Sequence, residues 1–144
     1  MIAIGCDHGG YELKCAVMSY LINKRIEYVD CGCDGERCDY PDIAEAVCKK
    51  VTSGECDRAI LICGTGIGMS MSANKIKGIR AAVCSDYYSA KYTRLHNNAN
   101  VLCLGGRVIG QGLALELVEV FLDTEFEGGR HVDRIEKMMK LEEK

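Results

Sequence analysis

Apolar residues along this chain form five short continuous runs. These runs are followed by stretches in which apolar positions recur every three or four residues. Short continuous runs are typical of buried β-strands, whereas the wider spacing is typical of one face of an α-helix. The pattern predicts strands at residues 2–6, 26–31, 57–63, 79–84 and 100–105. It predicts helices at residues 10–24, about 41–51, about 69–75, 86–96, 109–122 and 130–142.

Strands and helices alternate along the whole chain, and this rhythm favours a parallel sheet because parallel strands need a crossover connection. The strands are continuously apolar, as expected when helices cover both faces of a sheet. No linker, repeat or low-complexity tract divides the 144 residues. We therefore predict a single α/β domain over residues 1–144, a Rossmann-like three-layer α/β/α sandwich with a five-stranded parallel sheet.

Small and polar residues follow each predicted strand. They occupy residues 6–10, 31 onward, 63–68, 84–86 and 105–107. In an open α/β sheet, ligands bind beyond the carboxyl ends of the strands. We therefore expect one ligand site at this edge of the sheet, and we expect both His8 and His96 to lie there.

The composition argues against several classes of partner. A net charge of −3 is unfavourable for nucleic acid, whose binding needs a basic surface. No apolar run reaches membrane-spanning length, and the N-terminal segment MIAIGCDHGG lacks the basic residues that open a secretory signal. The expectation is a cytoplasmic protein that binds neither nucleic acid nor a membrane.

Ten cysteines are many for a chain of this length, but none forms a CxxC pair. Cys31, Cys33 and Cys38 lie close together in sequence, yet no fourth thiol or histidine nearby completes a metal site. Most of the other cysteines stand in apolar runs, where a thiol behaves as a small hydrophobe. The expectation is a reduced protein with free thiols and no metal.

The segment CGTGIGMSMS follows the third predicted strand and carries Gly64, Gly66 and Gly68. Its spacing fits neither the dinucleotide GxGxxG motif nor the P-loop, and Met69 replaces the arginine of a cysteine-phosphatase loop. Such glycines let consecutive backbone N–H groups point at one anion or developing oxyanion. The alternative is a tight turn from strand to helix without a ligand.

Cys63 stands between the buried strand and these N–H groups. A thiol in such a position is favoured as the thiolate, which can act as a nucleophile or as a general base. The alternative is an inert buried cysteine, and the abundance of cysteines in this chain keeps that alternative open.

Two arginines near the C-terminus indicate an anion site. Arg130 and Arg134 are four residues apart, so they share a face of the last predicted helix, away from Val132 and Ile135. In a protein of net negative charge an anionic ligand needs a local basic cluster, and Arg107 can join it. The alternative is a solvated helix face that mixes arginine with glutamate.

Six blocks of the sequence resemble one family. They are GCDHGG, DYPDIA, CGTGIGMSMSANK, GIRAAVCSD, HNNANVLCLGGRVIG and FEGGRHVDR. In this order they resemble the type B ribose-5-phosphate isomerases and the related galactose- and allose-6-phosphate isomerases, over nearly the whole chain. The resemblance implies an aldose–ketose isomerase that works through a cis-enediolate without metal or organic cofactor. It also implies a homodimer, or a tetramer, with sites shared between subunits and the C-terminal helix at the dimer interface.

The resemblance implies roles for single residues. Cys63 matches the proton-transfer base, His96 the residue that opens the sugar ring, and Thr65 a residue that holds the reacting end. Asp7 would lie near the ring oxygens and Asn97 would bind sugar hydroxyls. The other substrate- and phosphate-binding positions are His8, Tyr40, Gly64, Gly66, Ile67, Gly68, Arg107, Arg130 and Arg134. One branch of the family uses a downstream glutamate as base, but the segment MSMSANK has no carboxylate, so the chain resembles the cysteine branch.

The motifs leave the substrate open within one class, the small phosphorylated sugars. The interconversion of ribose 5-phosphate and ribulose 5-phosphate is the reaction that the resemblance favours. A six-carbon substrate, allose or galactose 6-phosphate, would use the same residues, and the depth of the pocket between Tyr40, residues 31–39 and His96 would decide. A non-catalytic sugar-phosphate binding module is a weaker alternative, since it would not need Cys63, His96 and Asp7 together.

Overall fold

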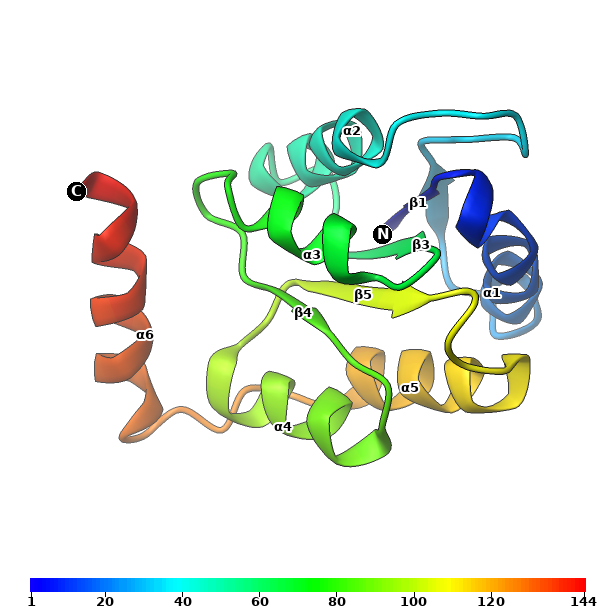
Figure 1. Ribbon diagram of the computed structural model, residues 1–144. Coiled ribbons are helices and arrows are strands. Elements are labelled where there is room, and N and C mark those ends of the chain that lie inside the picture. Colours follow the sequence, from blue (N-terminus) through cyan, green and yellow to red (C-terminus); the bar gives the residue numbers. More distant parts are fainter.

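A sheet of five parallel strands forms the centre of the computed structural model, which describes residues 1–144 (Figure 1). The strand order is β2-β1-β3-β5-β4. The strands are β1 (Ile2–Cys6), β2 (Tyr28–Asp30), β3 (Arg58–Cys63), β4 (Ala81–Val83) and β5 (Val101–Gly105). All five predicted strands and the parallel α/β fold are confirmed.

The two edge strands, β2 and β4, are three residues long and therefore shorter than the apolar runs predicted. Each edge strand has a single neighbour, and β2 pairs with β1 only over Ile2–Ile4. The chain nevertheless continues beside β1, because the Cys31 N–H donates to the Ile4 oxygen and the Cys33 N–H to the Cys6 oxygen, both at 2.8 Å. The apolar runs thus predicted the paired segments correctly and overestimated the length of regular strand.

Successive side chains of the central strands point to opposite faces of the sheet, and both faces are buried. In β3, Ile60 and Ile62 belong to one apolar cluster, whereas Ala59, Leu61 and Cys63 belong to the other. This arrangement explains why the central strands are apolar throughout, because neither of their faces meets water.

Helices form the outer two layers of the sandwich. They are α1 (Tyr11–Asn23), α2 (Tyr40–Thr52), α3 (Ile67–Ala73), α4 (Tyr87–Asn97), α5 (Gln111–Asp123) and α6 (His131–Lys140). Two short 3₁₀ turns, η1 (His8–Gly10) and η2 (Leu141–Glu143), precede α1 and follow α6. Side chains of α1, α4 and α5 complete the first apolar cluster, and those of α2 and α3 complete the second. The three predicted layers are therefore present.

Local signals in the sequence account for where several helices begin. Pro41 lies in the first turn of α2, where its missing N–H has no helical partner to lose. The Asp86 carboxylate accepts a hydrogen bond from the Ser89 N–H at 2.8 Å and so caps α4. No helix is both long enough and apolar enough to cross a membrane.

The last helix, α6, stands at the side of the sandwich, where α4 is the helix it contacts (Figure 1). His131 is buried, but the other side chains of α6 are exposed or half-buried. Val132 and Met138 are 40% and 42% exposed, and Leu141 of η2 is 63% exposed. Of the apolar side chains predicted for this helix, Val132 is thus left uncovered by the chain itself, whereas Ile135 is half-buried.

Candidate active site

The loops that follow β1, β3 and β5 meet at the carboxyl edge of the sheet. The chain leaves β1 towards β2 on one side and reaches β3 on the other, and ligands of open α/β sheets bind at such a switch point. The Asp7 N–H donates to the Ile62 oxygen at 3.1 Å, and the Arg107 N–H donates to the Gly64 oxygen at 2.9 Å. These bonds hold the three loops as one unit.

Bare backbone is required where these loops touch. A Cβ atom at Gly106 would lie 2.8 Å from the Gly9 oxygen, so no side chain fits between the loops after β1 and β5. Gly66 has a φ of 80°, in the left-handed region, and a Cβ there would lie 2.9 Å from the Leu104 carbonyl carbon. The tight-turn interpretation of the glycine loop is therefore correct for Gly66, and packing alone explains that residue.

The glycine loop also leaves several N–H groups free. The N–H groups of Gly64, Thr65 and Gly68 donate to no atom of the chain, whereas the Ile67 N–H donates to the Thr65 hydroxyl at 3.2 Å. Free backbone donors grouped in one loop are suited to an anion or an oxyanion. The segment is thus a tight turn that also presents free donors.

Cys63 ends β3 directly before these donors and is 5% exposed. Its sulfur accepts a hydrogen bond from the Gly66 N–H at 3.1 Å. A backbone N–H that donates to sulfur favours negative charge on that atom. The contact distinguishes Cys63 from the cysteines that lie only among apolar side chains.

All ten cysteines are free thiols. Burial raises the pKa of the Cys48 thiol to about 12 and that of the Cys84 thiol to about 11. Burial also raises the pKa of the Cys6 thiol to about 12, although the nearby Lys14 ammonium opposes the shift. These three behave as small apolar side chains, as the sequence predicted.

The loop after β1 and the start of α2 border Cys63. Asp7 is 8% exposed, and one oxygen of its carboxylate accepts from the Gly9 N–H at 2.8 Å, which caps η1. His8 is exposed next to it. The Tyr40 ring lies against the glycine loop, since a Cβ at Gly68 would be 2.5 Å from its Cε1 atom. Both segments therefore border Cys63 at the carboxyl edge of the sheet, where open α/β sheets have their ligand crevice. This place is called the Cys63 crevice.

Arg107 supplies the positive charge at this edge. A Cβ at Gly64 would lie 3.4 Å from Nη1 of Arg107, so the guanidinium lies over the glycine loop. The side chain is exposed and forms no ion pair with a carboxylate of the chain. A free guanidinium beside free N–H groups is suited to a phosphate or a carboxylate.

The structure does not place His96 and Asn97 at this edge. They lie at the end of α4, where the Arg80 Nε donates to the Asn97 oxygen at 3.0 Å and the chain then enters β5 at Val101. A crossover helix runs back along the sheet, so its last turn lies at the amino ends of the strands. The prediction that His8 and His96 share one edge within a chain is therefore wrong.

Arg130 and Arg134 also lie away from the Cys63 crevice in their own chain. Arg130 precedes the first residue of α6, Arg134 lies in its first turn, and both are exposed. The helix that carries them contacts α4, which has His96 in its last turn. One chain therefore holds the predicted residues as two separate groups, one around Cys63 and one around His96.

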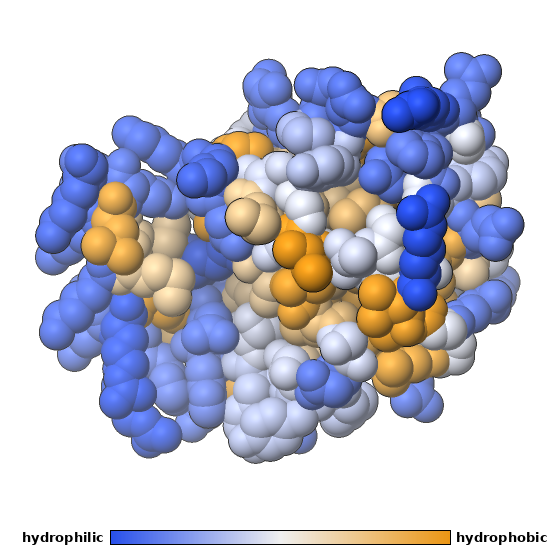
Figure 2. Space-filling model, viewed as in Figure 1, coloured by the Kyte–Doolittle hydropathy of each residue, from blue (hydrophilic) through white to orange (hydrophobic).

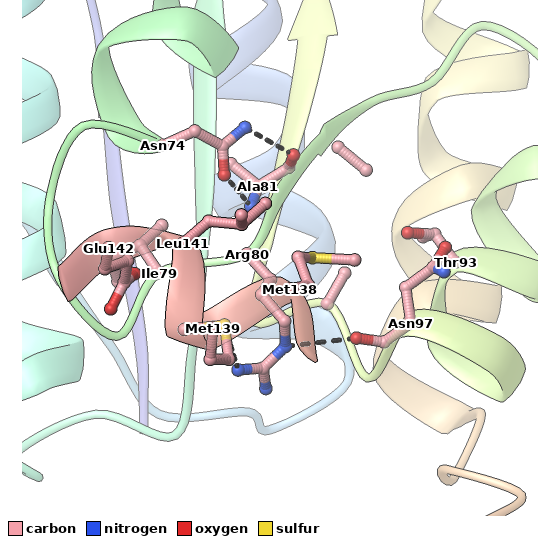
Figure 3. Close-up of a pocket in the computed structure, with 12 residues that line it drawn as sticks. Asn74, Ile79, Arg80, Ala81, Thr93, Asn97, Met138, Met139, Leu141 and Glu142 are labelled. Carbon is pink, nitrogen blue, oxygen red and sulfur yellow. Dashed lines mark hydrogen bonds between the residues drawn. The ribbon is translucent and has the colours of Figure 1, made fainter. Parts of the chain in front are cut away.

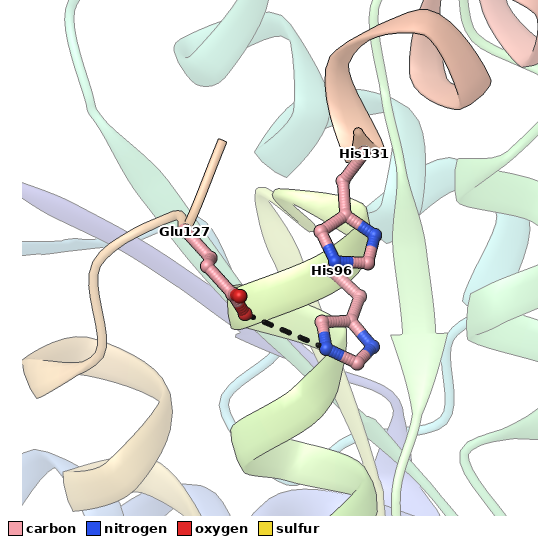
Figure 4. A group of neighbouring side chains, drawn as sticks. All are labelled: His96, Glu127 and His131. Carbon is pink, nitrogen blue, oxygen red and sulfur yellow. Dashed lines mark ion pairs between the residues drawn. The ribbon is translucent and has the colours of Figure 1, made fainter. Parts of the chain in front are cut away.

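His96 belongs to a compact group with Glu127 and His131 (Figure 4). The two imidazole rings stack with centroids 4.1 Å apart and planes 15° apart, and His96 Nε2 lies 3.6 Å from a Glu127 oxygen. The His131 Nε2 atom is buried without a hydrogen-bond partner. Burial lowers the pKa of His131, and the nearby His96 and Arg130 add to the shift.

These three side chains carry the only group of potential metal-ligating atoms, all within 4.8 Å of one another. Metal ligands must converge on one point at about 2 Å each, with the metal near the plane of each imidazole. Two nearly parallel stacked rings point their nitrogens side by side instead of at one point. The arrangement is therefore that of a stacked pair next to a carboxylate. Neither Glu127 nor His131 was predicted to be a site residue, although both lie in the block FEGGRHVDR.

A groove of about 520 Å³ separates the C-terminal segment from the sandwich (Figure 3). Met138, Met139 and Leu141 line one side of it, and Arg80 lies on the other. One Arg80 N–H group points at the Met139 sulfur at 3.6 Å. The groove lies at the amino edge of the sheet beside the end of α4, so it is distinct from the Cys63 crevice.

Known proteins resemble this chain over nearly its whole length. The family described as Ribose/Galactose Isomerase matches residues 2–138. The chain belongs to this family. The resemblance predicted from the sequence blocks is thereby confirmed.

Three relatives show which activities are named within this family. Ribose-5-phosphate isomerase B of Escherichia coli is 47% identical over 144 residues, which are 99% of this chain and 97% of the relative. D-erythrulose-4-phosphate isomerase of Pectobacterium atrosepticum is 47% identical over 95% of this chain and 91% of its own. The solved structure of Clostridium thermocellum ribose-5-phosphate isomerase B is 50% identical, with a TM-score of 0.97 over 99% of this chain and 97% of that one.

Proposed function

We propose that the protein is an aldose–ketose isomerase that interconverts ribose 5-phosphate and ribulose 5-phosphate through a cis-enediolate. The observation that carries this proposal is the buried Cys63 sulfur, which accepts from the Gly66 N–H at 3.1 Å at the carboxyl edge of the sheet. Relatives named as ribose-5-phosphate isomerase B, 47% to 50% identical over nearly the full chain, support the substrate.

Proton transfer between C1 and C2 is assigned to Cys63. Its thiolate removes a proton from one carbon, and the electron pair forms the enediolate while the oxygen on the neighbouring carbon becomes negative. The free N–H groups of Gly64, Thr65 and Gly68 are placed to stabilise that oxygen. In the enediolate, the proton of the C2 hydroxyl passes to the negative C1 oxygen. The thiol then returns its proton to C1, and the C2 oxygen becomes the carbonyl of the ketone. The Thr65 side chain holds the reacting end of the sugar.

Ring opening is assigned to His96 and Asp7. As the bond between C1 and the ring oxygen breaks, protonated His96 gives a proton to that oxygen. The C1 hydroxyl passes its proton to the Asp7 carboxylate, and C1 becomes the aldehyde. Asn97 and Tyr40 bind the sugar hydroxyls in this proposal.

A complete site then needs two copies of the chain, because His96 lies at the amino edge and Cys63 at the carboxyl edge. We infer a two-fold homodimer in which the His96 edge of one chain faces the Cys63 crevice of the other. Apolar side chains gather on the face of α3, β4 and the loop after β5 (Figure 2), among them Ile67, Val83 and Val108, 53%, 42% and 59% exposed. This face adjoins the Cys63 crevice and is suited to cover by a second copy.

The phosphate binds between the two chains in the same arrangement. His8 and Arg107 come from the chain that supplies Cys63, and Arg130 and Arg134 come from the chain that supplies His96. Four groups of this kind offset the charge of a phosphate in a protein whose net charge is −3. The exposure of all four in a single chain is consistent with this assignment.

A substrate panel tests the proposed function. Purified protein would be assayed with ribose 5-phosphate, erythrulose 4-phosphate, allose 6-phosphate and galactose 6-phosphate at several concentrations. We expect the highest kcat/KM on ribose 5-phosphate. A higher value on a four- or six-carbon substrate would reassign the substrate and keep the chemistry, whereas binding of sugar phosphates without turnover of any would favour a binding module.

A further inference from the structure

The connection between α5 and α6 is fastened to the end of α4. The Glu127 N–H donates to the Leu95 oxygen at 3.1 Å, and the Arg94 Nε donates to the Thr124 oxygen at 3.0 Å. Arg94 is 3% exposed, so the second bond is shielded from water. Backbone contacts therefore fix the position of Glu127 independently of any ligand.

The His96 ring is held from three directions. Its Nε2 atom lies 3.6 Å from a Glu127 oxygen, and the His131 ring stacks on it at 4.1 Å. The Tyr92 ring meets it edge to face at 4.9 Å. Figure 4 shows that Nδ1 of His96 lies on the side of the ring away from Glu127. Only one nitrogen of His96 is therefore engaged by this group.

We propose that Glu127 and His131 are positioning residues for His96: the Glu127 carboxylate lies beside Nε2 as a counter-ion, the stacked His131 fixes the ring plane, and Nδ1 exchanges the proton with the sugar. This inference rests on the proposed role of His96 in ring opening. The arrangement follows the logic of a catalytic histidine that a carboxylate orients through its second nitrogen. The imidazolium that forms on His96 gains the carboxylate as a counter-ion.

The distribution of charge supports this division of roles. Two imidazolium rings 4.1 Å apart would repel each other, so only one of the pair can readily carry charge. Burial lowers the pKa of His131, which favours the neutral form of that ring. The titratable and charged groups around the pair are Tyr92 from α4, Glu127 from the connection, and Arg130 and Arg134 from α6.

Nitrogen NMR tests the tautomer and the counter-ion directly. The chain has three histidines, so replacement of His8 and of His131 assigns the His96 signals. We expect neutral His96 to carry its proton on Nε2, and Glu127→Gln to move the Nε2 signal of His96, because the carboxylate lies beside that nitrogen. Glu125→Gln, a matched change at an exposed carboxylate two residues away, should leave that signal unchanged. An Nε2 signal that Glu127→Gln does not move, or a proton on Nδ1, would overturn the proposal.

Kinetics then connect the position of His96 to ring opening. Ribose 5-phosphate is a closed ring, whereas erythrose 4-phosphate is open because its ring-forming hydroxyl carries the phosphate. Glu127→Gln should lower kcat on ribose 5-phosphate by about 10- to 100-fold, with a smaller loss on erythrose 4-phosphate and little change in KM. Wild-type kcat on ribose 5-phosphate in Glu127→Gln would overturn the proposal.

The stacking role of His131 has its own pair of variants. His131→Phe keeps a flat ring against His96 and should retain kcat on ribose 5-phosphate within about threefold, whereas His131→Ala should lose about tenfold. Equal losses in the two would remove the stacking role. If wild-type protein turns over no sugar phosphate, the proposed function fails. The Nε2 signal of His96 in the NMR experiment still decides whether Glu127 orients His96.

Discussion

Cys63 differs from the other buried thiols in its partner. Cys48 and Cys84 are raised in pKa by burial, and neither sulfur has a backbone N–H donor. Cys63 is equally buried, but the Gly66 N–H donates to its sulfur at 3.1 Å. This backbone contact is therefore the feature that singles out Cys63 as the proposed base in a chain with ten cysteines.

Replacement of Cys63 by alanine tests its role as base. Cys63→Ala should fold normally and still bind ribose 5-phosphate, because the N–H groups and arginines remain. Turnover should fall by about 10²–10⁴-fold, the usual cost of losing a general base. Cys48→Ala serves as the matched control at another buried thiol and should keep near-native kcat. Native turnover in Cys63→Ala would show that another group moves the proton.

Lys14 is an unusual residue for the interior, since only 1% of its side chain is exposed. Its ammonium donates to both Asp30 oxygens, at 2.8 and 3.0 Å, and also to the Cys33 backbone oxygen. The bonds tie α1 to β2 and to the segment that leads towards α2. A buried charge of this kind is tolerated only while its partner is present.

Asp30→Ala should therefore destabilise the protein by about 2–3 kcal/mol, because it leaves a buried ammonium without a counter-ion. The expected loss is below that of a fully buried pair, since 37% of the Asp30 side chain is exposed. Lys14→Met keeps the apolar stem and should cost less. Denaturant unfolding measures both, and a larger loss in Lys14→Met would contradict this account.

At the scale of elements, the direction of α4 decides where the candidate residues lie. The helix follows β4 and returns to the start of β5, so its last turn, with His96 and Asn97, reaches the amino edge of the sheet. The sequence shows these residues directly before a strand, and a parallel crossover then fixes their edge. The sequence therefore contained the information that corrects the expectation for His96.

The stability of the protein should depend on pH through His131, the first residue of α6. Burial lowers the pKa of His131 below its ordinary value of 6.5, with His96 and Arg130 as smaller causes. The unfolded chain thus binds this proton more tightly than the folded one, so the stability present above pH 6.5 is lost as the pH falls through the folded pKa. We expect the melting temperature to fall less between pH 7.5 and 5.5 in His131→Phe than in wild type. Parallel slopes in a thermal-unfolding series would refute this.

At the scale of the whole molecule, the two groups of site residues lie on different edges of the chain. Cys63 and Arg107 lie at the carboxyl edge, whereas His96 is at the amino edge and Arg134 is on α6, which contacts α4. The proposed dimer with shared sites would bring such groups together and would cover exposed apolar side chains of α6, such as Val132 and Met138.

Mixing two inactive variants tests the shared site. Cys63→Ala lacks the base, and Arg134→Ala should bind phosphorylated sugars poorly, so each homodimer should be nearly inactive. Mixed dimers should regain one intact site, built from Cys63 of one chain and Arg134 of the other. Recovery should approach about half the wild-type rate per mixed dimer. Demonstrated exchange of subunits without recovery would mean that each site is built within one chain.

Local patterns were enough to predict the fold, because buried strands, helical spacing and turn residues can be assembled into a parallel sheet in only a few ways. It also determined the group around Cys63, since Asp7, His8 and the glycine loop each follow a strand directly. Contacts between segments that are remote in the sequence came only from the tertiary structure. It showed that the Gly66 N–H reaches the Cys63 sulfur and that Glu127 and His131 pack on His96. Such contacts depend on how loops and helices settle against one another, and hydrophobic spacing does not encode them.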